Sequence, residues 1–226
     1  MPMPFRNRRD AGRRLADELQ RFEAQAPVVL ALPRGGVPVA YEVATRFRAP
    51  LDVLIVRKLG APRHPELAMG AIASGGAIVL NREILNMFHV SDDALREETA
   101  RQAEEVARRS ALYRGDRPAP DVRGRTVLLI DDGLATGATM KAGVEALRQY
   151  DPARVVVGVP IAAPEGCQLM SETADEVVCA ETPAEFLAVG MWYQDFEQTT
   201  DREVIELLAA ARQERSVAGH LSRQAG

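Results

Sequence analysis

The residues best suited to chemistry are concentrated in residues 127–139, which read Val-Leu-Leu-Ile-Asp-Asp-Gly-Leu-Ala-Thr-Gly-Ala-Thr. Four apolar residues in a row predict a fully buried strand, and Asp131 and Asp132 follow at its carboxyl end. Two hydroxyls, Thr136 and Thr139, come just before a helical pattern, and a helix N-terminus is a natural phosphate site. Acids beside a phosphate would repel it unless a cation or sugar hydroxyls lay between them. The run therefore predicts one ligand with phosphate, hydroxyls and a divalent metal.

This order of residues resembles the 5-phosphoribosyl-1-pyrophosphate (PRPP) motif of the type I phosphoribosyltransferases, a hydrophobic strand, two acids, a short variable stretch and Thr-Gly-x-Thr. The resemblance implies that Asp131 and Asp132 bind ribose hydroxyls, directly or through water bound to Mg²⁺, the expected cofactor. It also implies a loop whose backbone amides and hydroxyls hold the 5-phosphate. That loop comprises Ala135, Thr136, Gly137, Ala138 and Thr139. For any one of these residues alone, an ordinary strand–turn–helix would be the better interpretation.

A second candidate loop, Pro33-Arg34-Gly35-Gly36, follows a short apolar strand candidate and precedes a helical pattern. Its glycines would let the backbone approach a ligand closely, and its arginine suits phosphate oxygens. The segment resembles the pyrophosphate loop of the same family, which often contains a non-prolyl cis peptide, so we expect such a bond near Arg34. A plain Gly-Gly turn is the alternative.

Arg57 and Lys58 stand at the predicted exit of a strand at residues 51–56, before a stretch rich in Gly, Pro and Ala at residues 60–76. They resemble the Arg-Lys-x-x-x-Pro stretch of purine-type enzymes, which leads into a mobile loop over the reacting centre. The resemblance implies that both cations offset pyrophosphate charge while the closed loop excludes water. It also gives Glu66 the place of a glutamate implicated in catalysis. Snorkelling cations and an exposed glutamate are the alternatives.

The motif says less about which base would accept the phosphoribosyl group of PRPP. The 6-oxopurine enzymes have an Asp where this chain has Ala135, whereas adenine-type enzymes carry Leu-Ala-Thr-Gly, as found here from Leu134. Gly133 departs from the usual bulky apolar residue of the motif. An aromatic cluster at residues 191–196, with the single Trp192, could stack on a base, although core or dimer packing is the favoured interpretation.

Strand and helix patterns alternate along the chain, which predicts an α/β fold with a parallel sheet flanked by helices. Further strand candidates are residues 28–32, 77–80, 154–159 and 176–180, and helix candidates are residues 8–24, 91–113, 164–171 and 201–213. Residues 60–115 break this rhythm. Together with residues 181–200, they are expected to form a hood over the active edge of a single domain spanning residues 1–226.

Composition sets broad limits on function. The chain is 46% hydrophobic and 27% charged, and its net charge of -4 argues against a general affinity for nucleic acid. Cys167 and Cys179 suggest neither a metal site nor a disulfide framework, and Cys179 in an apolar run is expected to be a buried free thiol. The absence of a signal-peptide pattern or a membrane-length apolar window makes a cytoplasmic, membrane-free protein the expectation.

Together these features predict transfer of the 5-phosphoribosyl group from PRPP to a nitrogen base, with release of pyrophosphate. A nucleobase acceptor, a role in nucleotide salvage and a homodimer are what the resemblance implies. One alternative is a regulator that senses PRPP or nucleotides without catalysis, for which the arginines of residues 6–14 could bind nucleic acid. A Rossmann-like nucleotide binder is disfavoured because Gly-x-Gly-x-x-Gly does not follow the first strand.

Overall fold

The computed structural model describes the backbone of residues 5–224 and the side chains of residues 5–217. Within this range, the main sheet has five parallel strands in the order β2-β1-β6-β7-β8. These strands are β1 (Val28–Ala31), β2 (Leu51–Val53), β6 (Thr126–Ile130), β7 (Arg154–Ile161) and β8 (Glu176–Glu181). The predicted α/β fold with a parallel sheet flanked by helices is therefore confirmed.

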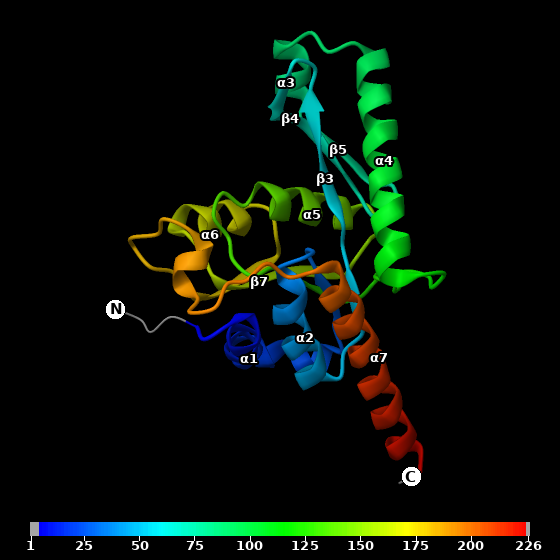
Figure 1. The fold of residues 1–226 in the computed structure, drawn as a ribbon, viewed down its shortest axis with the longest axis vertical. Coiled ribbons are helices and arrows are strands. Elements are labelled where there is room, and N and C mark those ends of the chain that lie inside the picture. The colour runs from blue at the N-terminus through cyan, green and yellow to red at the C-terminus, as the bar shows by residue number, and fades with distance from the viewer. Residues whose placement is uncertain (1–4, 225–226) are drawn as a thin grey trace.

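The apolar runs form the centre of this sheet because helices cover both of its faces, which leaves no polar side for alternation. On one face lie α1 (Arg8–Glu18), α2 (Gly36–Phe47) and α7 (Asp201–Gln224), and on the other lie α5 (Ala138–Arg148) and α6 (Pro164–Ser171) (Figure 1). Neighbouring strand residues point to opposite faces of the sheet. Leu128 therefore packs into the core on the side of α1, α2 and α7, and Leu129 packs into the core on the side of α5 and α6.

The segment between β2 and β6 forms a second, antiparallel sheet, with the order β3-β4-β5. Its strands are β3 (Val56–Ala61), β4 (His64–Ala73) and β5 (Ile78–Leu80), and they are followed by α3 (Arg82–Met87) and α4 (Asp92–Arg114). Figure 1 shows α4 running alongside this sheet, which rises away from the parallel sheet. Ser91 caps α4, because its Oγ accepts a hydrogen bond from the backbone N of Ala94 at 3.3 Å.

The prediction of one strand at residues 51–56 with Arg57 and Lys58 at its exit is wrong. The chain leaves the parallel sheet after β2, and both cations lie inside β3. Residues 60–76, expected to be largely loop, form most of a hairpin instead. The small residues of this hairpin give no clear strand pattern in the sequence, and they allow neighbouring strands to approach each other closely. A Cβ on Gly70, for example, would lie 2.4 Å from the carbonyl oxygen of Val79.

Two helix predictions differ in extent. The helical pattern at residues 8–24 is divided into α1 and a 3₁₀ segment, η1 (Gln20–Gln25), and the closing helix extends well beyond residue 213. Residues 181–200 contain η2 (Val189–Trp192) and pack against the N-terminal segment. There the backbone N of Phe5 donates to the carbonyl oxygen of Trp192 at 2.8 Å. None of the helices within the described part of the chain could span a membrane.

The prediction of a free, buried thiol at Cys179 is also wrong. Cys167 on α6 and Cys179 on β8 are joined by a disulfide, and both residues are half-buried. The spacing of the two cysteines does not predict the disulfide, because the pairing depends on how the chain folds back after α6 to form β8. The helix packs directly against β8, which brings the two residues together.

Candidate functional site

The acid pair and the predicted pyrophosphate loop meet at one edge of the parallel sheet. Because β1 and β6 are neighbouring parallel strands, the loops at their carboxyl ends lie side by side. A Cβ on Gly35 would lie 2.1 Å from Oδ2 of Asp132, and one on Gly36 would lie 2.7 Å from the carbonyl oxygen of Ile130. Only glycines fit this contact. The peptide bond between Pro33 and Arg34 is cis, as expected.

The acid pair carries more negative charge than its surroundings neutralise. Oδ2 of Asp132 accepts a hydrogen bond from Nε of Arg8 at 2.7 Å, and Oδ1 of Asp131 accepts one from the backbone N of Asp132 at 2.8 Å. Burial and the adjacent Asp132 carboxylate raise the pKa of Asp131 well above its usual value. Burial also raises the pKa of Asp132, although Arg8 opposes that shift. A further cation would stabilise the ionised pair.

The predicted phosphate loop is open to solvent at the start of α5. Thr136 and Thr139 are exposed, whereas Gly137 is buried and has a φ of 74°. Gly137 is the N-cap of α5, and none of the described side chains caps this helix. Backbone N–H groups of the first turn and two hydroxyls are therefore available to an anion.

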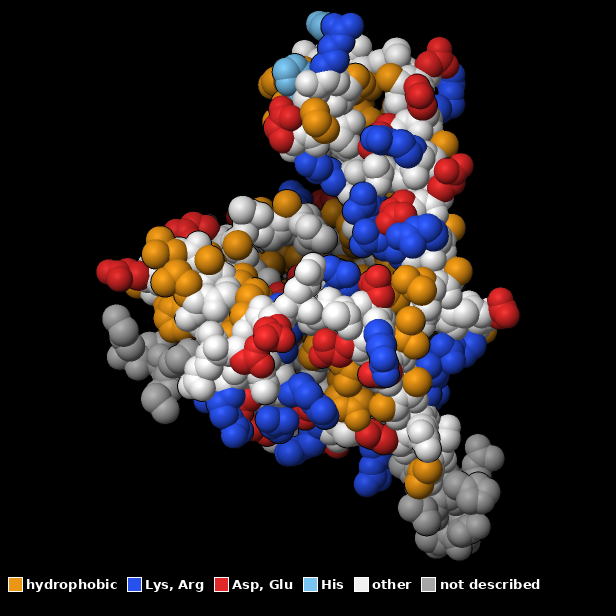
Figure 2. Space-filling model, viewed as in Figure 1, with side chains coloured by type: hydrophobic (Ala, Val, Ile, Leu, Met, Phe, Trp, Pro, Cys, Tyr) orange, Lys and Arg blue, Asp and Glu red, His pale blue; other side chains and the backbone are white. Residues whose placement is uncertain are grey.

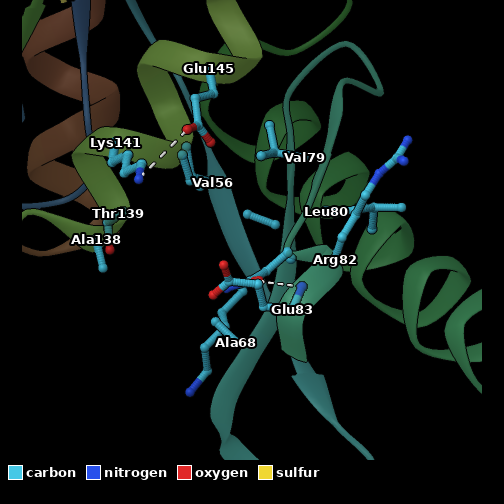
Figure 3. Close-up of a pocket in the computed structure, with 15 residues that line it drawn as sticks. Val56, Ala68, Val79, Leu80, Arg82, Glu83, Ala138, Thr139, Lys141 and Glu145 are labelled. Carbon is cyan, nitrogen blue, oxygen red and sulfur yellow. Dashed lines mark hydrogen bonds and ion pairs between the residues drawn. The ribbon is translucent and has the colours of Figure 1, made fainter. Parts of the chain in front are cut away.

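A cavity of about 630 Å³ adjoins this loop and is lined by residues of α5 and of the second sheet. Thr139, Lys141 and Glu145 lie on the side of α5 that faces β3, where Val56 lines the opposite wall (Figure 3). Lys58 lines the same cavity from β3. The structure therefore places Lys58 and the phosphate loop around one space.

Arg57 and Glu66 lie elsewhere. Arg57 points to the opposite face of the hairpin, where its Nε donates to Oε1 of Gln102 on α4 at 3.0 Å. Glu66 is exposed near the hairpin turn, with its Oε1 3.5 Å from Nδ1 of His64. Neither residue lines the cavity beside the phosphate loop.

The guanidinium of Arg34 lies 3.6 Å from the carboxylate of Asp201 at the start of α7. Asp201 also accepts a hydrogen bond from the hydroxyl of Tyr113 at 2.5 Å. Burial and this hydrogen bond raise the pKa of Tyr113 to about 12, so the phenol stays protonated at neutral pH. An anion at the pyrophosphate loop would compete with Asp201 for Arg34.

Two residues that the sequence pattern did not single out contact the acid pair. Arg8, only 12% exposed, also donates from Nη1 to the carbonyl oxygen of Glu197 at 2.7 Å and stacks over Phe196 at 3.8 Å. The hydroxyl of Tyr193 donates to the backbone carbonyl of Asp132 at 2.5 Å. Arg8 is one of five arginines within residues 6–14, so its charge alone did not distinguish it.

The unusual Gly133 has a structural reason. A Cβ at this position would lie 2.4 Å from Cγ1 of Val189 and 3.0 Å from Cγ2 of Ile161. The η2 segment thus occupies the space that a bulky residue would need. The motif and residues 181–200 are packed together, in line with the favoured packing interpretation of the aromatic cluster.

Comparison with known proteins identifies the family. Residues 6–194 match the model of the phosphoribosyl transferase domain. A protein of Mycobacterium tuberculosis, provisionally named a phosphoribosyl transferase, is 45% identical over 221 residues, which are 98% of this chain and 50% of that protein. The bifunctional protein PyrR of a Roseiflexus species is 32% identical over 139 residues, 54% of this chain and 63% of that protein.

A crystal structure of the protein TT1426 from Thermus thermophilus superposes with a TM-score of 0.82 at 47% identity, covering 91% of this chain and 98% of that one. The chain spans about half the length of the mycobacterial relatives. The family model covers most of the chain, including the pyrophosphate loop, the acid pair and the phosphate loop. The chain therefore belongs to the phosphoribosyl transferase domain family.

Proposed function

We propose that this chain transfers the 5-phosphoribosyl group of PRPP to a nitrogen base, such as a nucleobase, and releases pyrophosphate. The observation that carries the proposal is the contact of Gly35 and Gly36 with the acid pair, beside the open phosphate loop. This arrangement provides donors for two phosphate groups and acceptors for sugar hydroxyls along one sheet edge. Membership of the family supports the same activity.

In the proposed reaction, the base nitrogen forms a bond to C1 of the ribose as the C1–oxygen bond to pyrophosphate breaks. Pyrophosphate leaves with the bonding electrons, and a proton on the attacking nitrogen passes to solvent. Residues 135–139 hold the 5-phosphate, Asp131 and Asp132 accept hydrogen bonds from ribose hydroxyls, and the loop of residues 33–36 holds pyrophosphate. Catalysis then consists of orienting the reactants and stabilising separated charge.

Mg²⁺ is the proposed cofactor. No group of three or more His, Cys, Asp or Glu residues within the described part of the chain could hold a metal ion. Mg²⁺ commonly binds through one or two carboxylates together with water and substrate phosphates, so Asp131 and Asp132 suit it. Their raised pKa values support this fit, because an added cation would favour the ionised forms. Bound Mg²⁺ would neutralise charge on pyrophosphate.

The first test measures pyrophosphate release from PRPP and Mg²⁺ with a panel of bases. We expect Asp132→Asn to lower turnover about a hundredfold, because it removes a charge that stabilises the transition state. We expect Thr136→Val to weaken PRPP binding about tenfold through the loss of a hydrogen bond to a charged group. Asp93→Asn and Thr99→Val, both on α4, are the matched controls. Wild-type turnover in Asp132→Asn, or wild-type PRPP affinity in Thr136→Val, would contradict the proposal.

A PRPP-sensing regulator is the second possibility that this assay distinguishes, since it would bind PRPP without releasing pyrophosphate with any base. The basic residues around α1 give little support to an accompanying nucleic-acid surface. Figure 2 shows acidic side chains among them. Arg6, Arg13 and Arg14 surround Asp10, and Arg9 pairs with Glu42. A homodimer is part of the enzyme proposal, and light scattering of the purified chain measures it directly.

A further inference from the structure

A separate cavity of about 310 Å³ lies between the predicted pyrophosphate loop and α4. We call it the arginine cavity, because its charged lining consists of Arg34, Arg108, Arg109 and Asp201. The acid pair and the two glycines of the pyrophosphate loop do not line it. Three positive charges therefore face one negative charge here, away from the acid pair, and this excess suits an anion with two charges.

Helical spacing brings the two arginines of α4 to this cavity. One face of the helix carries, at i, i+3, i+4 and i+7, the residues Glu105, Arg108, Arg109 and Leu112. Glu105 accepts hydrogen bonds from Nε of Arg108 at 2.8 Å and from Nε of Arg109 at 2.6 Å. These hydrogen bonds lower the pKa of Glu105 to about 2, so its carboxylate is ionised at neutral pH and holds both guanidinium groups in place.

The three arginines keep hydrogen-bond donors for a ligand. Glu105 engages Nε and Nη2 of Arg108 but only Nε of Arg109. Among the described residues, nothing accepts a hydrogen bond from Nη1 of Arg108 or from either Nη of Arg109. The guanidinium of Arg34 lies 3.6 Å from the carboxylate of Asp201, which is longer than a hydrogen bond. Each arginine can therefore donate to an anion without first losing a strong contact.

Asp201 shows that a negative charge is favoured in the arginine cavity. The hydrogen bond from Tyr113, together with the charges of Arg34 and Arg109, holds the pKa of Asp201 below its usual value. Its side chain is 48% exposed, so it can turn into solvent and leave its place to a ligand. The hydroxyl of Tyr113 could then donate to that ligand, because its phenol stays protonated at neutral pH.

A phosphate group suits these donors better than a carboxylate does. It carries up to two negative charges and at least three acceptor oxygens, so it can contact several arginines at once, and the planar guanidinium binds it through paired hydrogen bonds. The volume is at the lower end of the range for small-ligand pockets. Apart from Tyr113, the apolar lining consists of Pro33 and Leu112, so a large apolar ligand would find little contact.

We propose that the arginine cavity binds a free phosphate dianion, either inorganic phosphate or a small phosphate monoester, through Arg34, Arg108 and Arg109. Arg34 also belongs to the predicted pyrophosphate loop, and its guanidinium cannot serve two separate anions fully. Phosphate in the cavity therefore weakens PRPP binding, and PRPP weakens phosphate binding by the same factor. This effect on PRPP rests on the proposed transferase function, whereas the phosphate site itself does not.

The site is tested by calorimetric titration of the full chain with inorganic phosphate and with glycerol phosphate, and the probe that binds more tightly identifies the source. Arg108→Gln and Arg109→Gln should each weaken that binding about tenfold, through the loss of charged hydrogen bonds. Asp201→Asn should strengthen it up to about fivefold, because the competing carboxylate is removed. Arg101→Gln removes an exposed charge of α4 outside the cavity and should bind phosphate as the wild type does.

Phosphate could also bind at the predicted phosphate loop, and Thr136→Val separates the two places. Binding that both arginine variants weaken and Thr136→Val keeps supports the arginine cavity. The inference is overturned if phosphate binding is lost in Thr136→Val and unchanged in Arg108→Gln and Arg109→Gln. It is also overturned if the wild-type chain binds neither probe.

The effect on PRPP is measured by titrating PRPP and Mg²⁺ with and without phosphate. Phosphate should weaken PRPP binding by a larger factor in the wild type than in Arg109→Gln, and equal factors would overturn the coupling through Arg34. Without phosphate, Arg108→Gln and Arg109→Gln should keep PRPP affinity within about twofold of wild type.

A loss of about tenfold without phosphate would assign the cavity to the PRPP site and overturn the inference, although the transferase function would stand. If the wild-type chain binds no PRPP, the proposed function fails. The phosphate titrations then still decide the inference, since they contain no PRPP. Failure of the function and failure of the phosphate site therefore give different results.

Discussion

At the scale of single residues, Arg8 has the greatest influence on the acid pair. It approaches Asp132 from the first turn of α1 and contacts the backbone of Glu197 and the ring of Phe196. Its charge opposes the rise in the pKa of Asp132 that burial causes. Arg8 therefore favours the ionised form of Asp132, and its hydrogen bond orients this carboxylate beside the pyrophosphate loop.

Arg8→Gln should raise the pKa of Asp132 further, because the opposing positive charge is removed while burial remains. Asp132 would then be protonated at pH values where the wild-type carboxyl is ionised. The acid limb of the pH profile of kcat should move to higher pH, and turnover at neutral pH should fall about tenfold.

Arg8→Lys should restore part of both effects. The control is Arg9→Gln, which removes a neighbouring charge that pairs with Glu42 on α2. A measurement of kcat from pH 5 to 9 checks the prediction. An unchanged acid limb in Arg8→Gln would show that Arg8 serves packing alone.

Among the elements of the fold, the turn between α6 and β8 is linked by hydrogen bonds of Asp175 to β7 and α5. Its Oδ2 accepts hydrogen bonds from the backbone N of Val155 on β7 at 2.6 Å and from Nη1 of Arg148 on α5 at 2.7 Å. The hydrogen bond from Arg148 holds the pKa of Asp175 below its usual value. The loop side of α6 abuts the phosphate loop, so this link also supports the site.

Asp175→Asn should lower the free energy of unfolding by about 1 kcal/mol at pH 7, through weaker hydrogen bonds at a partly exposed position. A carboxyl with a depressed folded-state pKa stabilises the fold above its unfolded pKa and loses that contribution as the pH falls through its folded pKa. The difference between wild type and variant should therefore shrink below about pH 4. Urea unfolding across this range, with Asp93→Asn as control, measures it. A constant difference would exclude an electrostatic origin.

At the scale of the whole molecule, the two sheets are joined by an ion pair between β2 and the end of α4. Nε of Arg114 lies 2.8 Å from Oδ2 of Asp52, and the two side chains are 13% and 10% exposed. Asp52 also accepts a hydrogen bond from the backbone N of Val53 at 2.8 Å. The pair thus fastens the helix that supports the second sheet to the edge of the parallel sheet.

Arg114→Met should lower the free energy of unfolding by about 3 kcal/mol, because it leaves the Asp52 charge buried without its partner. Asp52→Asn combined with Arg114→Met should lose clearly less than the sum of the single changes, since the double variant contains no buried charge. Guanidinium denaturation of the three variants measures the coupling. Additive losses would show that the pair does not act as a unit.

Much of the parallel sheet could be predicted because its signals are local. The apolar runs at β6 and β7 have no polar alternation, as expected for strands covered on both faces, and α6 coincides with its predicted range. The hairpin of β3 and β4 could not be predicted, because its small residues resemble a loop and its stability depends on packing against α4 and α5. The disulfide was missed because it depends on the contact between α6 and β8.

The acid pair and the predicted phosphate loop could be recognised from residue order alone, because strand, loop and helix start follow one another within residues 127–139 and their geometry is local. Which cations lie near this site depends on the tertiary structure. Arg8 reaches Asp132 only through the packing of α1, and Lys58 is separated from Arg57 only by the pleat of β3. Side-chain direction at such positions depends on contacts between distant segments, which residue type and spacing do not encode.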